Sequence, residues 1–316
     1  MGTPPFAALC LEALLETRHT VEAVVTQPDR PAGRGREIRR SAVAELADAQ
    51  GLETLQPERA GDPAFLERLT ALAPDLAVVV AYGRILPART IEIPPLGCIN
   101  AHASLLPLLR GAAPIQHAIL EGHERTGVTI MRINERMDAG DMLLAREIAI
   151  HSDDDSGSLT RRLAAISGEL LVAATEDIAA GRAVATAQDE SKATYAPPIA
   201  KEHARIEWNE DAVRCERRVR AVRPRPGAFT FDDATRLKVL EARVAVRAGE
   251  HEPGTAVELL GDALIVTCGS GALALETVQP EGRRPMSAGD YQRGCGRALP
   301  RRLGDAGRDS HDARTR

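Results

Sequence analysis

Through its first 180 residues the chain alternates short β-branched apolar runs with stretches of helical periodicity. The run at residues 76–81 is apolar throughout, which is typical of a strand buried on both faces of a mainly parallel sheet. We expect strands at 21–27, 76–82, 97–100, 128–134 and 143–150, and helices at 5–17, 41–51, 63–73, 114–121 and 158–181. This alternation predicts a doubly wound, Rossmann-like α/β domain whose ligands bind beyond the carboxyl ends of the strands.

The remaining third of the chain has a different pattern. Residues 182–200 are polar and show neither period, so we expect a linker there. A helix is expected at 211–222, and short alternating runs follow at 228–231, 237–246, 255–260, 263–267 and 272–277. Short strands with glycine turns predict a small β-barrel or sandwich over 201–295. From 296 to 316 the chain is rich in Arg, Gly and Asp, and we expect a disordered tail.

Composition narrows the class of protein. No run approaches eighteen apolar residues, which excludes an obvious membrane span, and residues 1–5 lack the basic start and apolar stretch of a secretory signal. The 5 cysteines are scattered, which indicates reduced thiols in a cytoplasm rather than disulfides or a zinc site. The net charge is −5, yet residues 201–316 carry more basic than acidic side chains. This split fits an enzyme with a module for a polyanion, although chance can also produce it.

Asn100 and His102 are the first candidates for chemistry. They stand two residues apart at the end of an apolar strand, so both side chains point to one face. An amide beside an imidazole suits addition to a carbonyl: the amide stabilises a developing oxyanion and the imidazole moves a proton. The alternative is that both residues only cap the end of the strand.

A carboxylate in the segment 137–141 is the next candidate. Asp138 precedes Ala139 and Gly140 in a turn that can point a side chain into a cleft. A carboxylate there can orient the histidine and stabilise its charged form. Asp141 is the rival, and either aspartate can instead be an ordinary turn former.

Several long motifs resemble the methionyl-tRNA formyltransferase family. They are Ser-Leu-Leu-Pro at 104–107, Arg-Gly-Ala-Ala-Pro-Ile-Gln at 110–116, Thr-Gly-Val-Thr-Ile-Met at 126–131 and Met-Asp-Ala-Gly-Asp-Met at 137–142. Shorter matches are Ala-Tyr-Gly at 81–83, Ala-Arg-Ile-Glu-Trp at 204–208 and Pro-Gly-Ala-Phe at 226–229. The resemblance extends over residues 1–293, in order and spacing.

The resemblance implies a formyltransferase catalytic domain at 1–181 and an OB-like tRNA-binding barrel at 201–295. It implies that Asn100, His102 and Asp138 are catalytic, and that Ser104, Leu105, Leu106 and Pro107, with Tyr82 and Gly83, bind folate. It further implies 10-formyltetrahydrofolate as donor co-substrate, the α-amine of initiator methionyl-tRNA as acceptor, no metal and a monomer. The product would be the N-formylmethionyl-tRNA that initiates protein synthesis.

Two basic segments favour a tRNA partner. The loop at 27–40 contains Arg30, Arg34, Arg36, Arg39 and Arg40, interleaved with Pro and Gly, and indicates a flexible basic finger. The resemblance implies that this loop enters the acceptor arm and that Arg34 is its key arginine. The second segment, at 214–225, includes Arg217 and Arg218, which can contact phosphates. Either segment can instead be a solvated charged surface.

Two other functions remain open at this level. One is formyl transfer to a small amine, such as a nucleotide sugar or glycinamide ribonucleotide, because the sheet and the Asn-His-Asp trio do not name the acceptor. The other is a nucleic-acid-binding module with an inactive α/β domain, which the intact trio disfavours. Labelled formyl transfer at several salt concentrations separates the three.

Two departures from the family pattern carry consequences. The family usually opens with an apolar interior strand, which is missing before Met1 here. We therefore expect either a start site a few residues upstream or a gap in the sheet. Leu108 and Leu109 stand where the family commonly has Arg-Trp, which removes a cation and an aromatic ring beside the folate segment.

Overall fold

The computed structural model describes residues 1–32, 37–246 and 251–304. These residues form two compact units. The first comprises Met1–Ile115, Glu124–Ile150 and Ser158–Pro198, and the second comprises Gln116–His123, His151–Gly157 and the chain from Ile199 onward. Most of the segment expected to be a linker therefore belongs to the first unit.

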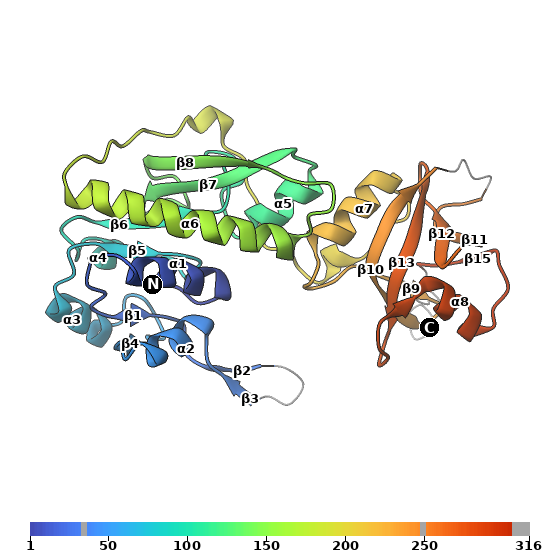
Figure 1. Ribbon diagram of the computed structural model, residues 1–316, viewed down its shortest axis with the longest axis horizontal. Coiled ribbons are helices and arrows are strands. Elements are labelled where there is room, and N and C mark those ends of the chain that lie inside the picture. The colour runs from blue at the N-terminus through green and yellow to red at the C-terminus, as the bar shows by residue number, and fades with distance from the viewer. Residues whose placement is uncertain (33–36, 247–250, 305–316) are drawn as a thin grey trace, which may run out of the picture. The chain divides into compact units, whose positions relative to one another are not determined.

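The first unit contains a four-stranded sheet in the order β5 (Ala77–Val79), β6 (Cys98–His102), β7 (Arg125–Arg132) and β8 (Met142–Ala149) (Figure 1). β5 and β6 are parallel, whereas β7 and β8 are antiparallel to their neighbours. A separate parallel pair joins β1 (Val24–Val25) to β4 (Thr54–Leu55). The predicted α/β class is confirmed, with the correction that two of the three strand pairings in the main sheet are antiparallel.

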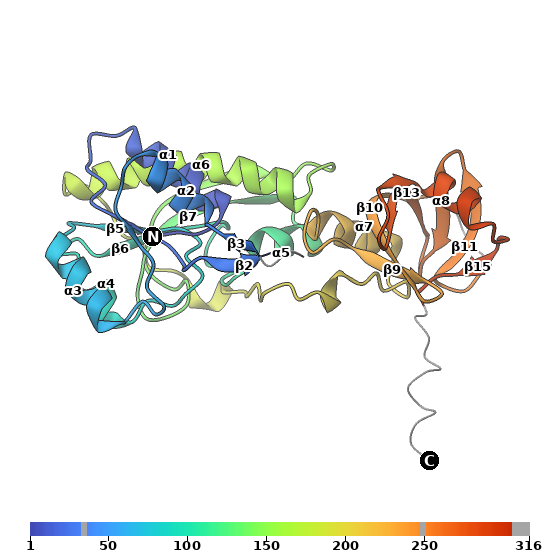
Figure 2. The same ribbon diagram turned by 90° about the horizontal axis from the view of Figure 1, so that it is seen from below.

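Helices cover both faces of this sheet, as the predicted doubly wound arrangement requires (Figure 2). On one side lie α1 (Pro5–Leu15), α2 (Ala42–Ala49) and α6 (Ser156–Ala179); on the other lie α3 (Pro63–Leu72) and α4 (Ala88–Ile91). α2 begins where the hydroxyl of Ser41 accepts a hydrogen bond from the amide of Ala44 at 3.0 Å, a stabilising N-cap. No helix in the described ranges has the length and apolarity to span a bilayer.

Met1 and Gly2 occupy the space between β1 and β5. The amide of Gly2 donates to the carbonyl of Val25 at 2.9 Å, and the carbonyl of Met1 accepts from the amide of Val80 at 2.8 Å. Next to Met1, the described residues leave a cavity of about 440 Å³, lined largely by apolar side chains of α1, β1 and β5. Met1 and Gly2 thus bridge β1 and β5, strands of two separate sheets.

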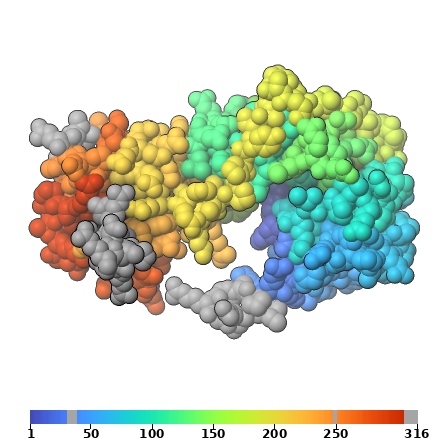
Figure 3. Space-filling model, turned by 180° about the vertical axis from the view of Figure 1, so that it is seen from behind, coloured from blue at the N-terminus to red at the C-terminus, as the bar shows by residue number. Residues whose placement is uncertain are grey.

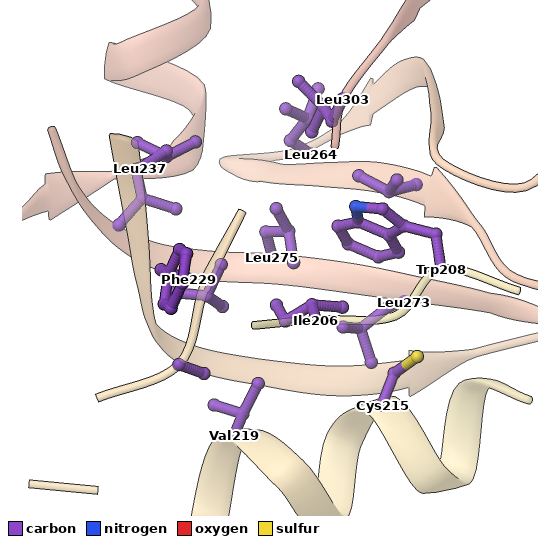
Figure 4. Packing of buried hydrophobic residues seen from close by; sticks show 14 of the residues in the cluster. Ile206, Trp208, Cys215, Val219, Phe229, Leu237, Leu264, Leu273, Leu275 and Leu303 are labelled. Carbon is purple, nitrogen blue, oxygen red and sulfur yellow. The ribbon is translucent and has the colours of Figure 1, made fainter. Parts of the chain in front are cut away.

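The second unit is an antiparallel barrel. Its strands are β9 (Phe229–Asp232), β10 (Thr235–Ala245), β11 (Thr255–Leu260), β12 (Ala263–Thr267), β13 (Ala272–Pro280), β14 (Met286–Ser287) and β15 (Arg301–Arg302), paired in the order β15-β11-β12-β13-β10-β9 with β14 on β13. Figure 4 shows Trp208, Leu264 and Leu275 packed in the barrel core beside α7 (Ala212–Ala221). The indole N–H of Trp208 donates to Thr230 Oγ1 at 2.9 Å, which satisfies a buried donor. The expectation of an OB-like barrel is confirmed.

The expected disordered tail is wrong over residues 296–304. After α8 (Ala288–Cys295) the chain returns to the barrel, where β15 pairs with β11 and Leu303 is buried. Arg297 and Arg301 reach the fully buried Asp232, at 2.7 and 2.9 Å. These ion pairs and the buried Leu303 connect the segment to the barrel. The expected disorder of residues 305–316 falls outside the described residues.

Candidate active site

Asn100 and His102 lie at the carboxyl end of β6, in the centre of the four-stranded sheet. Asn100 is aligned with Val79 of β5 and Met131 of β7, so its backbone is paired on both sides. Asn100 is half-buried, whereas His102 is 5% exposed. Because alternate residues of a strand share a face, the two side chains project to the same side of the sheet.

Both ring nitrogens of His102 face oxygen atoms. Nε2 lies 2.9 Å from the carbonyl oxygen of Leu109, and Nδ1 lies 3.6 Å from Oδ2 of Asp138. A carbonyl oxygen only accepts hydrogen bonds, so Nε2 is the protonated nitrogen in this arrangement. Nδ1 is therefore the atom on which a second proton would be received, next to a carboxylate that stabilises the resulting charge.

Asp138 is fixed by its backbone conformation and by a bond from the loop at Gly111. Its φ is +48°, in the left-handed region that non-glycine residues rarely adopt, and its Oδ2 accepts a hydrogen bond from the amide of Gly111 at 2.8 Å. The rival Asp141 is exposed, and only its backbone carbonyl bonds with Arg132 in this region. The structure therefore brings Asp138, and not Asp141, to the histidine.

The segment 104–107 forms a tight turn beside His102, and its residues divide into two sets. Ser104 and Leu106 are buried: the hydroxyl of Ser104 donates to the carbonyl of Leu108 at 2.5 Å, and the amide of Leu106 donates to Thr129 Oγ1 at 3.1 Å. Leu105 and Pro107 remain partly exposed. Ser104 and Leu106 thus shape the turn, while Leu105 and Pro107 can meet a ligand.

Comparison with known proteins defines the family. The "Formyl transferase" model matches residues 1–175, and the "Formyl transferase, C-terminal domain" model matches residues 198–296. The chain is 49% identical over 290 residues to the methionyl-tRNA formyltransferase of Methylococcus capsulatus, covering 92% of this chain and 94% of that protein. It is 47% identical over 300 residues to that of Anaeromyxobacter dehalogenans, covering 94% and 96%. The chain belongs to the methionyl-tRNA formyltransferase family.

Solved structures share the fold of this formyltransferase at low sequence identity. The sugar 3N-formyl transferase WlaRD, crystallised with dTDP and 5-N-formyl-THF, aligns with a TM-score of 0.65 at 14% identity, over 90% of this chain and 97% of that one. HypX from Aquifex aeolicus, in complex with tetrahydrofolic acid, aligns with a TM-score of 0.57 at 20% identity, over 78% of this chain and 43% of that one. Both likenesses establish the fold alone.

Burial limits the expected folate contact through Tyr82 in this formyltransferase. Its side chain is 2% exposed and packs among Val25, Phe65 and Leu86, which leaves the ring little surface for a ligand. Burial raises the pKa of its hydroxyl. Only its backbone faces the site loops, where its carbonyl accepts from Gln27 Nε2 at 2.9 Å. The neighbouring Gly83 is exposed and remains a candidate.

Two paired strands lie within the basic loop at 27–40 of the formyltransferase. β2 (Arg30–Ala32) and β3 (Glu37–Arg39) are antiparallel, with Arg30 directly opposite Arg39. Arg40 lies just beyond and bonds with Asp48 at 2.8 Å. Two like charges facing each other across a strand pair are destabilising without a counter-charge. Arg34 and Arg36, also expected to contact tRNA, lie outside the described residues.

The two arginines expected on α7 have different surroundings. The guanidinium of Arg218 is 13% exposed, bonds with Glu210 at 2.5 Å and donates to the carbonyls of His203 and Arg205. These bonds connect segments of the second unit, and they leave the guanidinium of Arg218 poorly placed to bind a phosphate. Arg217 is partly exposed and lies against Gly122, just past the end of α5 (Pro114–Leu120). It remains a candidate.

Sequence reasoning missed three residues close to the trio. Arg110 was seen only as part of a motif, and Gln188 and Glu190 were assigned to a linker. In the structure Gln188 donates to the carbonyl of Asp138 at 2.9 Å, and Arg110 bonds with both Gln188 and Glu190. The motif around Arg110 was the available signal for that residue, whereas a lone glutamine in a polar segment offers none.

Proposed function

We propose that this enzyme transfers the formyl group of 10-formyltetrahydrofolate to the α-amine of methionine on initiator methionyl-tRNA. One observation carries the chemistry: the imidazole of His102 and the carboxylate of Asp138 converge at 3.6 Å beside Asn100, at the carboxyl end of a sheet strand. Ligands of open α/β sheets bind at such ends. Membership of the family supports the choice of donor and acceptor.

The mechanism assigns one role to each member of the trio. The folate substrate supplies a formyl carbon bonded to N10, which the neutral α-amine attacks. Asn100 donates a hydrogen bond to the oxygen that becomes negative, and His102 Nδ1 receives the amine proton directly or through water. Asp138 stabilises the charged imidazole, which then gives the proton to N10 as the C–N10 bond breaks. The new amide and the protonated N10 balance the reaction, with no covalent enzyme intermediate.

The residues around the trio fit a folate substrate. Leu105 and Pro107 present partly exposed apolar surface on the rigid turn, and Gly83 offers exposed backbone. The buried Thr129 accepts from the amide of Leu106 and donates to the carbonyl of Ser104 at 2.8 Å, which keeps the turn in one conformation. A preformed surface of this kind lowers the entropy cost of binding a flat, partly apolar ligand.

The acceptor is proposed from charge placement. Arg30 and Arg39 face each other with few counter-charges: the contact of Arg30 with Glu58 is 3.8 Å long. Phosphates of an RNA backbone would neutralise the pair. A small amine substrate does not carry a phosphate backbone that could neutralise both arginines. The hairpin therefore favours tRNA over a nucleotide sugar or glycinamide ribonucleotide.

The test is transfer of labelled formyl from 10-formyltetrahydrofolate to charged initiator tRNA, to nucleotide sugar amines and to glycinamide ribonucleotide, at several salt concentrations. We expect transfer to the tRNA alone, with a KM that rises steeply with salt. Transfer only to a small amine would overturn the proposed acceptor. tRNA binding without any transfer would indicate an inactive binding module instead.

We further infer that the enzyme acts as a monomer in the cytoplasm. The described chain has free cysteines at positions 10, 98, 215, 268 and 295, and four of them are buried. Unpaired thiols are typical of a reducing compartment.

Light scattering of the purified protein with and without tRNA measures the oligomeric state, and a dimer mass in both samples would contradict the monomer.

A further inference from the structure

The segment 186–196 is hydrogen-bonded to the loops that form the active site. Thr186 exchanges two backbone hydrogen bonds with Met142, each of 2.8 Å. The amide of Arg110 donates to the carbonyl of Thr194 at 2.8 Å, and the amide of Ala196 donates to the carbonyl of Arg110 at 2.7 Å. Figure 3 shows this stretch in yellow against the green surface of the same unit. The segment is therefore a fixed part of the catalytic unit.

Gln188 in this segment bonds with two loops at once. Its side-chain oxygen accepts from Arg110 Nε at 3.0 Å and Nη2 at 2.7 Å. Its side-chain nitrogen donates to the carbonyls of Asp138 at 2.9 Å and Gly140 at 2.7 Å. Gln188 is 9% exposed, so these bonds form away from water and would leave buried polar atoms unsatisfied if they were lost.

Arg110 and Glu190 hold the amide of Gln188 in this orientation. Arg110 is 1% exposed and bonds with Glu190 at 3.0 Å, and the hydrogen bond from Arg110 lowers the pKa of Glu190. Glu190 also bonds with Arg136 at 2.7 Å, in the loop that leads to Asp138. The loop at 136–140 is thus tied to residues 188 and 190 at three points.

The loop needs such support because Asp138 has a left-handed backbone. Non-glycine residues rarely adopt that conformation, which persists where the surroundings impose it. Oδ2 of Asp138 lies 3.6 Å from Nδ1 of His102, beyond ordinary hydrogen-bond length. A small displacement of the loop therefore decides whether the carboxylate can bond with the imidazole.

We propose that Gln188 is a positioning residue, which holds the loop so that the carboxylate of Asp138 faces His102 during formyl transfer. This inference rests on the proposed function. The residue touches neither substrate nor imidazole, and acts through the backbone of Asp138 and Gly140.

The test compares Gln188→Glu and Gln188→Ala with the wild type. Glutamate keeps the acceptor for Arg110 but cannot donate to the two carbonyls. We expect kcat to fall about 10- to 100-fold, the range seen when partners that orient metal-bound histidines are removed, with KM for folate and tRNA changed less than about 2-fold. If Gln188→Ala does not fold, Gln188→Glu decides.

A double-mutant cycle separates positioning from general stability. On an Asp138→Asn background, Gln188→Glu should cost no further kcat, because the group it positions is already lost. Gln292→Ala is the matched control: Gln292 is 7% exposed and donates to the carbonyl of Arg297 at 2.7 Å in the barrel, so its loss should lower the melting temperature and leave kcat unchanged.

Two outcomes overturn the inference: an unchanged kcat in Gln188→Glu, or an equal loss of kcat on the Asp138→Asn background. The proposed function fails in a different way, through a wild-type enzyme that does not formylate charged initiator tRNA. If the wild type uses a small amine instead, the ratio of kcat values with that amine still tests Gln188.

Discussion

The imidazole of His102 lies between two acceptors, the carbonyl of Leu109 at 2.9 Å from Nε2 and the carboxylate of Asp138 at 3.6 Å from Nδ1. The shorter contact sets the tautomer, and the longer one leaves Nδ1 able to take up a proton. Leu109 has a φ of +58° and a buried side chain, so the carbonyl that sets the tautomer is itself held by its surroundings. Two residues with left-handed backbones, Leu109 and Asp138, thus contact the ring.

The trio makes the first prediction. Asn100→Ala should lower kcat about 10²- to 10³-fold, the loss seen when one oxyanion donor is removed, and His102→Ala about 10²- to 10⁴-fold through loss of proton transfer. tRNA affinity should stay nearly intact in both. Single-turnover formylation and filter binding measure the two quantities. Asp141→Asn is the control, and near-normal turnover of either trio variant would exclude its assigned role.

The basic hairpin makes the second prediction. Arg30→Ala and Arg39→Ala should each weaken tRNA binding and reduce the slope of log K against log salt by about 0.7 to 1, because one phosphate contact is lost. Arg125→Ala, which removes an exposed arginine paired with Glu147 elsewhere in the same unit, should leave the slope unchanged. Titrations at four salt concentrations test this, and equal slopes in all proteins would remove the hairpin from the tRNA contact.

Close packing around Gly140 makes the third prediction. A Cβ atom at this position would lie 1.8 Å from the carbonyl oxygen of Arg132, so Gly140→Ala must move the loop that carries Asp138. We expect a fall in kcat of at least about 10-fold with a modest loss of melting temperature. Gly294 in α8 has open space around it, and Gly294→Ala should be neutral or slightly stabilising. An active Gly140→Ala variant would show that the loop position is not critical.

The buried Asp232 makes the fourth prediction. Burial raises the pKa of this carboxyl, but hydrogen bonds from Arg301 and Tyr291 and the nearby guanidinium charges outweigh it and hold the pKa below its usual 3.8. A lowered pKa in the folded state stabilises the barrel above about pH 4, and that stabilisation is lost as the pH falls through the folded value. Calorimetry from pH 7 to pH 3 should show this loss in the wild type.

Asp232→Asn is the companion variant. It leaves Arg301, which is 12% exposed, without its charged partner, and should cost about 3–5 kcal/mol at pH 7. The difference from the wild type should shrink toward pH 3. A difference that is the same at every pH would show that the carboxylate charge does not hold the segment 296–304.

Local pattern alone predicted most of the elements and the candidate pair Asn100 and His102, whereas the choice of Asp138 came from the resemblance to the family. Apolar runs and helical periodicity depend on neighbouring residues, so the helix at 63–73 and the strand at 143–150 appeared within one residue of their observed bounds. The strand expected at 76–82 is shorter, Ala77–Val79. Asn100 and His102 followed from their spacing on a strand, because alternate residues of a strand share a face.

What only the tertiary structure decided concerns segments far apart in sequence. The fold of one loop places Asp138, and not Asp141, beside His102. The side chain of Tyr82 is buried in the core. Arg218 donates hydrogen bonds to the carbonyls of His203 and Arg205. Gln188 shows the reason most clearly, since its role depends on hydrogen bonds to residues about 50 and 78 positions away. Such contacts form only when the chain closes long loops. The sequence position of a polar residue shows no periodicity that identifies its hydrogen-bond partner.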